Sequence, residues 1–220
     1  MLRRALLLCG IVSSLLYLVT DLIGGLSYDG YSFTSQGVSE LMAVGAPSEH
    51  VVDPLFIAYG LLTAAFGTGV VLEGSRLGRR VRIVGGLILA YSILGLTGPT
   101  LFEMQRRGAN DLTGDLPHVV LTGVLVLLII GTIAVAASAF GKPFRFYSIA
   151  TLLTMMVAGA ASGPFGVRLA AGDPTPGFGI IERVNIYASL VWVAVLATLL
   201  HRGVRGPAGS VPHDETRGGR

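Results

Sequence analysis

Residues 118–140 read HVVLTGVLVLLIIGTIAVAASAF, and no acidic or basic side chain follows the histidine that opens this run. About 20 apolar residues in an α-helix are enough to cross the ~30 Å hydrocarbon core of a bilayer. Residues 118–140 are therefore predicted to form a membrane-spanning helix.

Five other apolar stretches are long enough, or nearly long enough, to cross the same thickness. They are Ala5–Leu26, Val52–Leu72, Ile83–Phe102, Phe146–Gly166 and Ile180–Leu200. The sequence therefore predicts an all-α fold, a polytopic membrane bundle of six transmembrane helices that forms one domain over residues 1–202. Residues 203–220 are rich in glycine, proline and charge, and are predicted to form a disordered cytoplasmic tail.

The overall composition agrees with a membrane protein and excludes several other classes. Of the 220 residues, 52% are hydrophobic and 13% are charged, and the mean hydropathy is +0.70. Soluble domains carry about 25% charged residues, so a soluble enzyme, a nucleic-acid-binding module and a disordered scaffold are excluded. The single cysteine, Cys9, also excludes an intrachain disulfide bond and a thiolate metal site.

The distribution of lysine and arginine predicts the orientation of the bundle. One side of the membrane would hold Arg3, Arg4, Arg76, Arg79, Arg80, Arg82, Lys142, Arg145, Arg202, Arg205, Arg217 and Arg220. The other side would hold only Arg106, Arg107, Arg168 and Arg183. Because basic loops stay in the cytoplasm, both termini are expected to be cytoplasmic, in a multi-pass protein of the plasma membrane. The lipid bilayer is then the first partner, and the basic strip faces anionic lipid rather than nucleic acid.

The first outer connection contains the stretch YDGYSFTSQGVSELMAVGAP, residues 28–47. Its apolar and polar residues recur at helical spacing, which predicts a short amphipathic helix lying on the outer interface. The apolar face would hold Val38, Leu41, Met42 and Gly45, and the polar face Gln36, Ser39, Glu40 and Ala43. Ser39 and Glu40 either form the polar wall of a pocket over the bundle or cap and solvate a surface helix.

Further ionisable residues fall in the same outer layer. Glu182 and Arg183 open the sixth predicted helix, and His118 opens the fourth. A carboxylate at a helix N-terminus complements the helix dipole, whereas an arginine there needs an acidic partner or an anionic ligand. The acids considered as partners of Arg183 are Glu40, Asp115 and Glu182.

These residues predict a polar ligand pocket at the extracytoplasmic face. Its candidate lining is Ser39, Glu40, Asp115, His118, Glu182 and Arg183, with Asp21, Gln36, Asp53, Glu103 and Arg106 as secondary candidates. The alternative is that the layer is an ion-pair network that ties the loops down.

The sequence offers little support for a cofactor or a defined reaction. Bis-histidine haem needs two facing histidines in the membrane, and only His118 lies at a helix mouth. No HxxxH or HExxH element supports a zinc hydrolase, and no GxSxG element supports a triad of Ser39, His118 and Asp115. No cofactor and no metal site are predicted, and catalytic residues cannot be assigned.

The order of several short elements resembles a known family. These elements are Tyr28-Asp29, Gln36-x-x-Ser39-Glu40-Leu41, His118, Gly179-Ile-Ile-Glu182-Arg183 and Leu190-Val-Trp192. Together they resemble the prokaryotic membrane-protein family catalogued as domain of unknown function 998, over roughly residues 4–202. The resemblance implies a six-helix integral membrane protein and no particular reaction.

We therefore expect an integral membrane protein that binds a lipid or another small amphipathic or anionic molecule in its outer polar pocket. Two alternatives stay open at this point: a membrane-embedded enzyme acting on a lipid-type substrate, and an accessory subunit that docks a protein partner through its outer loops. A transporter is less well supported, because the predicted inner half offers mostly neutral groups such as Ser13, Ser14, Thr63 and Thr132.

Overall fold

A computed structural model of the chain describes residues 1–102, 104–109 and 112–203, with only the backbone described for residues 98–101 and 112–115. The described part is helical and contains no strand. Its helices are α1 (Leu2–Leu26), the 3-10 turn η1 (Ser39–Met42), α2 (Glu49–Leu77), α3 (Arg79–Leu101), α4 (Leu112–Ala139), α5 (Lys142–Ser162), α6 (Phe165–Ala171) and α7 (Phe178–Gly203). Six of them, all except η1 and α6, are long and apolar enough to span a membrane.

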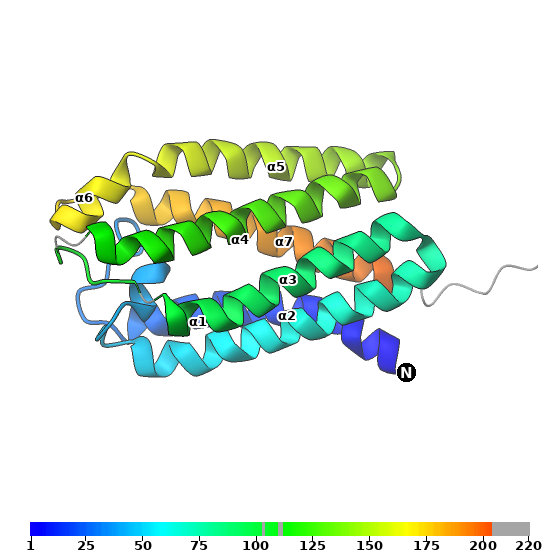
Figure 1. The fold of residues 1–220 in the computed structure, drawn as a ribbon, viewed down its shortest axis with the longest axis horizontal. Helices are drawn as coiled ribbons and strands as arrows, with labels where there is room; N and C mark the ends of the chain where they lie inside the picture. Colours follow the sequence, from blue (N-terminus) through cyan, green and yellow to red (C-terminus); the bar gives the residue numbers. More distant parts are fainter. Residues whose placement is uncertain (103, 110–111, 204–220) are drawn as a thin grey trace, which may run out of the picture.

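Successive long helices run in opposite directions along the long axis of the bundle (Figure 1). Their contacts join them into a ring. Each packs against the next long helix in the chain, and α7 closes the ring by packing against α1. One end of the bundle, which we call the terminal end, carries the start of α1, the end of α7 and two tight turns, at Gly78 and Gly141. The opposite end, which we call the polar end, carries the three longer connections, which follow α1, α3 and α5.

Two hydrophobic clusters fill the ring. The larger one lies towards the terminal end, where Leu7, Phe66 and Leu196 are fully buried. There the indole of Trp192 donates to Ser148 Oγ at 2.9 Å, which joins α7 to α5. The smaller cluster lies at the polar end and consists of Val38, Leu41 and Val52 with their partly buried neighbours. The first connection is thereby drawn into the core instead of lying across the surface.

The six predicted spans and the helical class are confirmed, and the structure differs from the prediction at three places. The helices at the terminal end are longer than the apolar stretches, because basic residues such as Arg79 and Lys142 belong to helical turns and can extend towards the interface. The fifth span ends at Ser162, and the separate helix α6 follows Gly163-Pro164.

The third difference concerns the short helix predicted in the first connection. It is present as the single 3-10 turn η1. Glu40, expected on an exposed polar face, is only 4% exposed, and Leu41 is fully buried. Burial on both faces shows that this turn is part of the fold's interior. The predicted tail from residue 204 onward lies outside the described residues.

The packing of α2 against α3 can be tested at two adjacent glycines. A methyl group at Gly85 would meet the backbone nitrogen of Val71 at 2.5 Å, whereas at Gly86 it would meet nothing within 4 Å. We expect Gly85→Ala to destabilise the protein by about 1–3 kcal/mol through overpacking, and Gly86→Ala to be neutral or slightly stabilising. Thermal unfolding in a mild detergent measures both, and equal midpoints for the two variants would contradict this packing.

Candidate functional site

The polar end is organised around an ion pair inside the bundle, between α1 and α7. The Arg183 Nε and Nη2 groups donate to the two carboxylate oxygens of Asp21 at 2.9 and 2.8 Å. Arg183 is 8% exposed and Asp21 is 1% exposed. A two-point contact between ionised groups is the strongest form of hydrogen-bonded pair, and it fixes α7 against α1.

The other donors of the Arg183 guanidinium are taken up by the first connection and by α7 itself. Nη1 lies 2.8 Å from the carbonyl oxygen of Phe33, 2.9 Å from that of Gln36 and 3.1 Å from that of Gly179. Nη2 also donates to the hydroxyl of Tyr31 at 2.7 Å. Since a guanidinium has five N–H groups, these acceptors and Asp21 use its full capacity. Arg183 therefore acts as a clamp that holds the loop to the helix.

Two tyrosines complete the surroundings of the pair. Tyr187, one turn further along α7, donates a short hydrogen bond to Asp21 Oδ2. The Tyr31 hydroxyl donates to the carbonyl oxygen of Gly37 at 2.7 Å. Burial raises the pKa of Tyr31 above its ordinary value, so this side chain is a neutral phenol that both accepts from Arg183 and donates to the loop backbone.

Glu182 binds the first connection at Val38 and Ser39, just after the residues that Arg183 holds. Its carboxylate accepts from the backbone N–H of Val38 at 2.6 Å and from the Ser39 hydroxyl at 3.4 Å. The approach is close enough to exclude side chains: a methyl group at Gly37 would collide with the Glu182 carboxylate, and one at Gly179 would lie 2.5 Å from the carbonyl oxygen of Phe33. The loop and the first turn of α7 are therefore in direct backbone contact.

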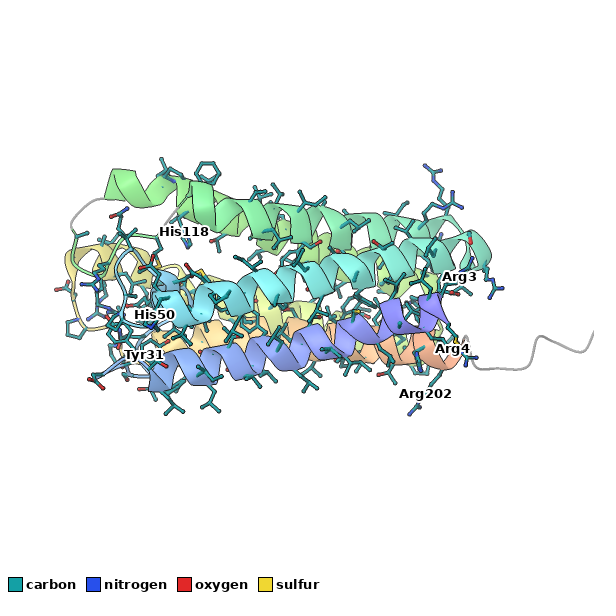
Figure 2. The ribbon with its side chains drawn as sticks, turned by 90° about the horizontal axis from the view of Figure 1, so that it is seen from below. Arg3, Arg4, Tyr31, His50, His118 and Arg202 are labelled. Atoms are coloured by element: carbon teal, nitrogen blue, oxygen red, sulfur yellow. The ribbon has the colours of Figure 1, made fainter. Side chains whose placement is uncertain are left out.

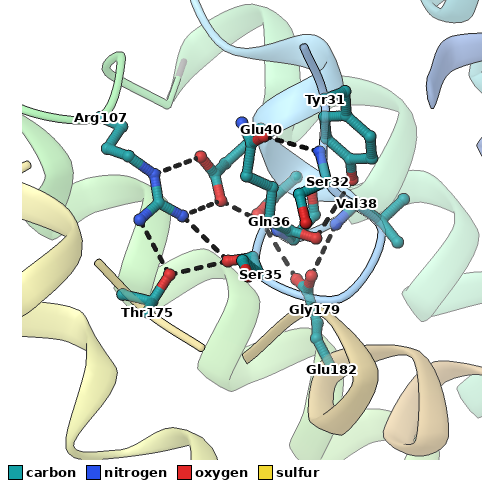
Figure 3. A network of polar contacts seen from close by, with 12 residues as sticks. Tyr31, Ser32, Ser35, Gln36, Val38, Glu40, Arg107, Thr175, Gly179 and Glu182 are labelled. Atoms are coloured by element: carbon teal, nitrogen blue, oxygen red, sulfur yellow. Dashed lines mark hydrogen bonds and ion pairs between the residues drawn. The ribbon is translucent and has the colours of Figure 1, made fainter. Parts of the chain in front are cut away.

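Arg107, in the connection between α3 and α4, joins all three long connections (Figure 3). Its Nε and Nη2 groups donate to the Glu40 carboxylate at 2.9 and 2.8 Å. Nη2 also reaches the carbonyl oxygen of Ser35 at 3.2 Å, and Nη1 donates to Thr175 Oγ1 at 2.8 Å and to the carbonyl oxygen of Asp173 at 3.1 Å. The Thr175 hydroxyl in turn donates to Ser35 at 2.7 Å.

Backbone hydrogen bonds extend these links. Val44 N–H donates to the carbonyl oxygen of Met104 at 3.0 Å, and Gly108 N–H donates to that of Leu169 at 3.1 Å. We call the joined unit the three-loop cap, made of residues 27–48, 104–109 and 163–177. It closes the polar end of the ring.

The structure brings together many of the residues predicted from the sequence. Asp21, Ser39, Glu40, Glu182 and Arg183 all belong to the network, and Gln36 contributes its carbonyl oxygen there. The acid paired with Arg183 is Asp21, which lies in the predicted outer layer but is not one of the three acids that the sequence suggests as its partner.

The network contacts given above do not include His118 or Arg106. His118 is half-buried, with Nδ1 3.2 Å from the carbonyl oxygen of Phe102. Arg106 is exposed beside Gly45, and Asp53 is exposed near the start of α2. Glu103 and the side chain of Asp115 lie outside the described part.

Sequence reasoning missed the roles of Arg107, Tyr31 and Thr175. Arg106 and Arg107 are adjacent in the chain, and nothing in their sequence context distinguishes the half-buried partner of Glu40 from its exposed neighbour. Among the residues that the structure describes, no group of three or more histidine, cysteine or acidic side chains is arranged to hold a metal ion.

The adjacent arginines provide a matched test of the three-loop cap. We expect Arg107→Gln to leave the Glu40 carboxylate, 4% exposed, without its cation. The cost should be about 2 kcal/mol, below the ~3–5 kcal/mol of fully buried pairs because the Arg107 side chain is 22% exposed. Arg106→Gln should cost less than about 0.5 kcal/mol. Hydrogen exchange of the amides of residues 35–41 measures the effect, and equal protection in both variants would refute the central position of Arg107.

The comparison with known proteins places the chain in a family without providing an activity. No curated protein and no solved structure matches the chain. One family model, described as a protein of unknown function (DUF998), matches residues 11–199. This match includes α1 from Ile11 onward, all of the three-loop cap, and nearly all of α7, so the described network lies inside the family's common region. The chain therefore belongs to the DUF998 family of proteins of unknown function.

Proposed function

We propose that the polar end binds a lipid head group or another small amphipathic, anionic molecule taken from the bilayer. The observation that carries this proposal is the neighbourhood of His118. The imidazole is half-buried at the start of α4, while the apolar side chains around it, Leu116, Val119 and Val120, are 58%, 60% and 57% exposed. A polar group beside an exposed apolar helix face matches a molecule with a polar head and a hydrocarbon tail.

Two polar or cationic groups belong to this part of the polar end, His118 and Arg106. Because the Phe102 carbonyl oxygen can only accept, Nδ1 of His118 donates to it, and Nε2 can donate to a ligand only when the imidazole is protonated. Arg106 lies four residues after Phe102 on the same connection and is exposed. Because the adjacent Arg107 is held by the two other connections, the backbone that carries Arg106 is fixed before any ligand arrives. Such preorganisation lowers the entropic cost of binding.

The residues that hold the loops together have a different role in this proposal. The donors of Arg183 and the contacts of Glu182 are already used within the protein. We assign Arg183, Glu182 and Glu40 to the support of the site, and Arg106 and His118 to contact with the ligand.

The proposal includes an orientation, with the polar end outside the cell and both termini in the cytoplasm of the plasma membrane. Five of the six long helices, all except α4, carry basic residues in their turns at the terminal end, where Figure 2 shows Arg3, Arg4 and Arg202. Tyr31, His50 and His118 lie at the other end in the same view. Lysine and arginine near membrane spans favour the cytoplasmic side, which supports this assignment.

Binding can be tested by native mass spectrometry of protein released from mild detergent with added phosphatidylglycerol or phosphatidylcholine. We expect wild type to retain phosphatidylglycerol preferentially, and the Arg106→Gln, His118→Ala double variant to lose about tenfold in affinity. Such a loss corresponds to about 1.4 kcal/mol, a plausible value for one ionic contact.

Arg202→Gln is the matched control, because Arg202 is exposed at the terminal end. Equal lipid retention in wild type and the double variant would overturn the proposal. A protein that instead copurifies with wild type in a fixed ratio would favour the accessory-subunit alternative.

The orientation can be tested separately with single cysteines in a Cys9→Ser background. We expect Thr34→Cys, exposed in the three-loop cap, to react with a membrane-impermeant maleimide on intact cells. Ser75→Cys, exposed at the terminal end of α2, should react only after permeabilisation. The opposite pattern would place the polar end in the cytoplasm.

A further inference from the structure

A small cavity lined by apolar side chains and by several hydroxyl groups lies near the middle of the ring, away from the three-loop cap. Its volume is about 20 Å³. Hydroxyl groups from five helices line it: Ser14 of α1, Tyr59 and Thr63 of α2, Tyr91 of α3, Thr132 of α4 and Ser189 of α7. Each of these residues is near the middle of its helix or within a few turns of it.

A gathering of polar groups at this depth needs a physical reason. Thr132 is fully buried, and Ser14 and Thr63 are each 4% exposed. In the hydrocarbon region, neutral polar side chains are stable only when their hydrogen-bonding groups find partners. The sequence places Ser14, Thr63 and Thr132 among the neutral groups of the predicted inner half, and the ring brings their side chains to one cavity.

The protons of the Ser14, Thr63 and Thr132 hydroxyls are used by backbone carbonyl groups of the helices. Thr63 donates to the carbonyl oxygen of Tyr59 at 2.8 Å, and Thr132 donates to that of Leu128 at 2.7 Å. Ser14 donates to the carbonyl oxygens of Gly10 and Leu190, at 2.9 and 3.0 Å. These hydroxyls therefore offer lone pairs, and not protons, to the cavity.

The tyrosines contribute one donor to the cavity. The hydroxyls of Tyr59 and Tyr91 lie 3.3 Å apart, so one donates to the other. The proton of the second hydroxyl is not used by this contact and can go either to Thr63, whose side chain lies within hydrogen-bonding reach of Tyr59, or to a molecule in the cavity. The lining thus combines several acceptors with a single donor, which suits a molecule that donates two hydrogen bonds and accepts one.

We propose that this cavity is a binding site for one water molecule at the middle of the membrane-spanning ring. A water needs about 10–15 Å³ and two to four polar partners, and the volume and the lining meet both conditions. An anion is disfavoured, because the lining supplies one donor. The water would donate to two of the hydroxyls whose own protons are committed to backbone carbonyls and accept from the tyrosine hydroxyl, so it would join up to three helices.

Water-edited solid-state NMR of the full chain in lipid bilayers tests the proposal. In wild type, we expect magnetisation from water to reach Thr63 and Thr132 several-fold faster than Val70 and Leu196, which are fully buried in the apolar cluster. Equally slow transfer to all four residues would overturn the proposal. This measurement uses wild type alone, so it does not depend on the folding of any variant.

A matched pair of variants on α2 adds a second measurement. Thr63 and Thr68 make the same bond to the carbonyl oxygen four residues earlier, at 2.8 and 2.9 Å, but Thr68 is exposed on the outside of the ring. We expect Thr63→Val to reduce water transfer to Thr132 by at least half, and Thr68→Val to leave it unchanged. Resonances of Thr63 that shift when sodium replaces choline at constant ionic strength would show a cation site and overturn the proposal.

Discussion

The pairing of Arg183 with Asp21 is the interaction on which the polar end depends. Both charges lie within helices long and apolar enough to span a membrane, where an ionised side chain without a partner is costly. The cost is offset by two-point contact with Asp21, by the Tyr187 and Tyr31 hydroxyls and by three carbonyl oxygens. Those carbonyls belong largely to the first connection, so the groups that stabilise the buried charge are the same groups that shape the loop. Removing either charged partner from such a pair typically costs about 3–5 kcal/mol.

The ring and the three-loop cap depend on one another. Six helices in a ring have no central helix to pack against, and their polar end would present open interhelical space to the interface. The first connection fills that space with Val38 and Leu41, and Arg107 binds it to the other two connections. At the middle of the ring, where no connection reaches, hydroxyl groups line the remaining space instead. Apolar side chains, backbone carbonyls and hydroxyl groups thus fill or line the space inside the ring at different depths.

The sequence predicted the elements of the fold better than the contacts between them. Length and apolarity were sufficient for the six spans, because a helix in lipid satisfies its own backbone and needs little information from its neighbours. The layer that holds Asp21, Glu40, Glu182 and Arg183 was also predicted, since ionisable residues at the ends of spans share a depth. Their pairing was not, because depth does not specify which helices are adjacent around the ring. Glu40 shows the limit most clearly: its helical spacing suggested an exposed face, whereas tertiary contact with Arg107 buries it.

The ion pair joins positions 162 residues apart, in the first and the last helix of the ring. During synthesis, α1 therefore enters the membrane with an acid whose guanidinium partner has not yet been made. The first connection meanwhile lacks both Arg183 and Glu182, and its carbonyl groups near residues 33–36 have no cation to bind. Only the insertion of α7 supplies these groups, and the same step closes the ring. The first of the three connections to be synthesised is therefore among the last to acquire its contacts.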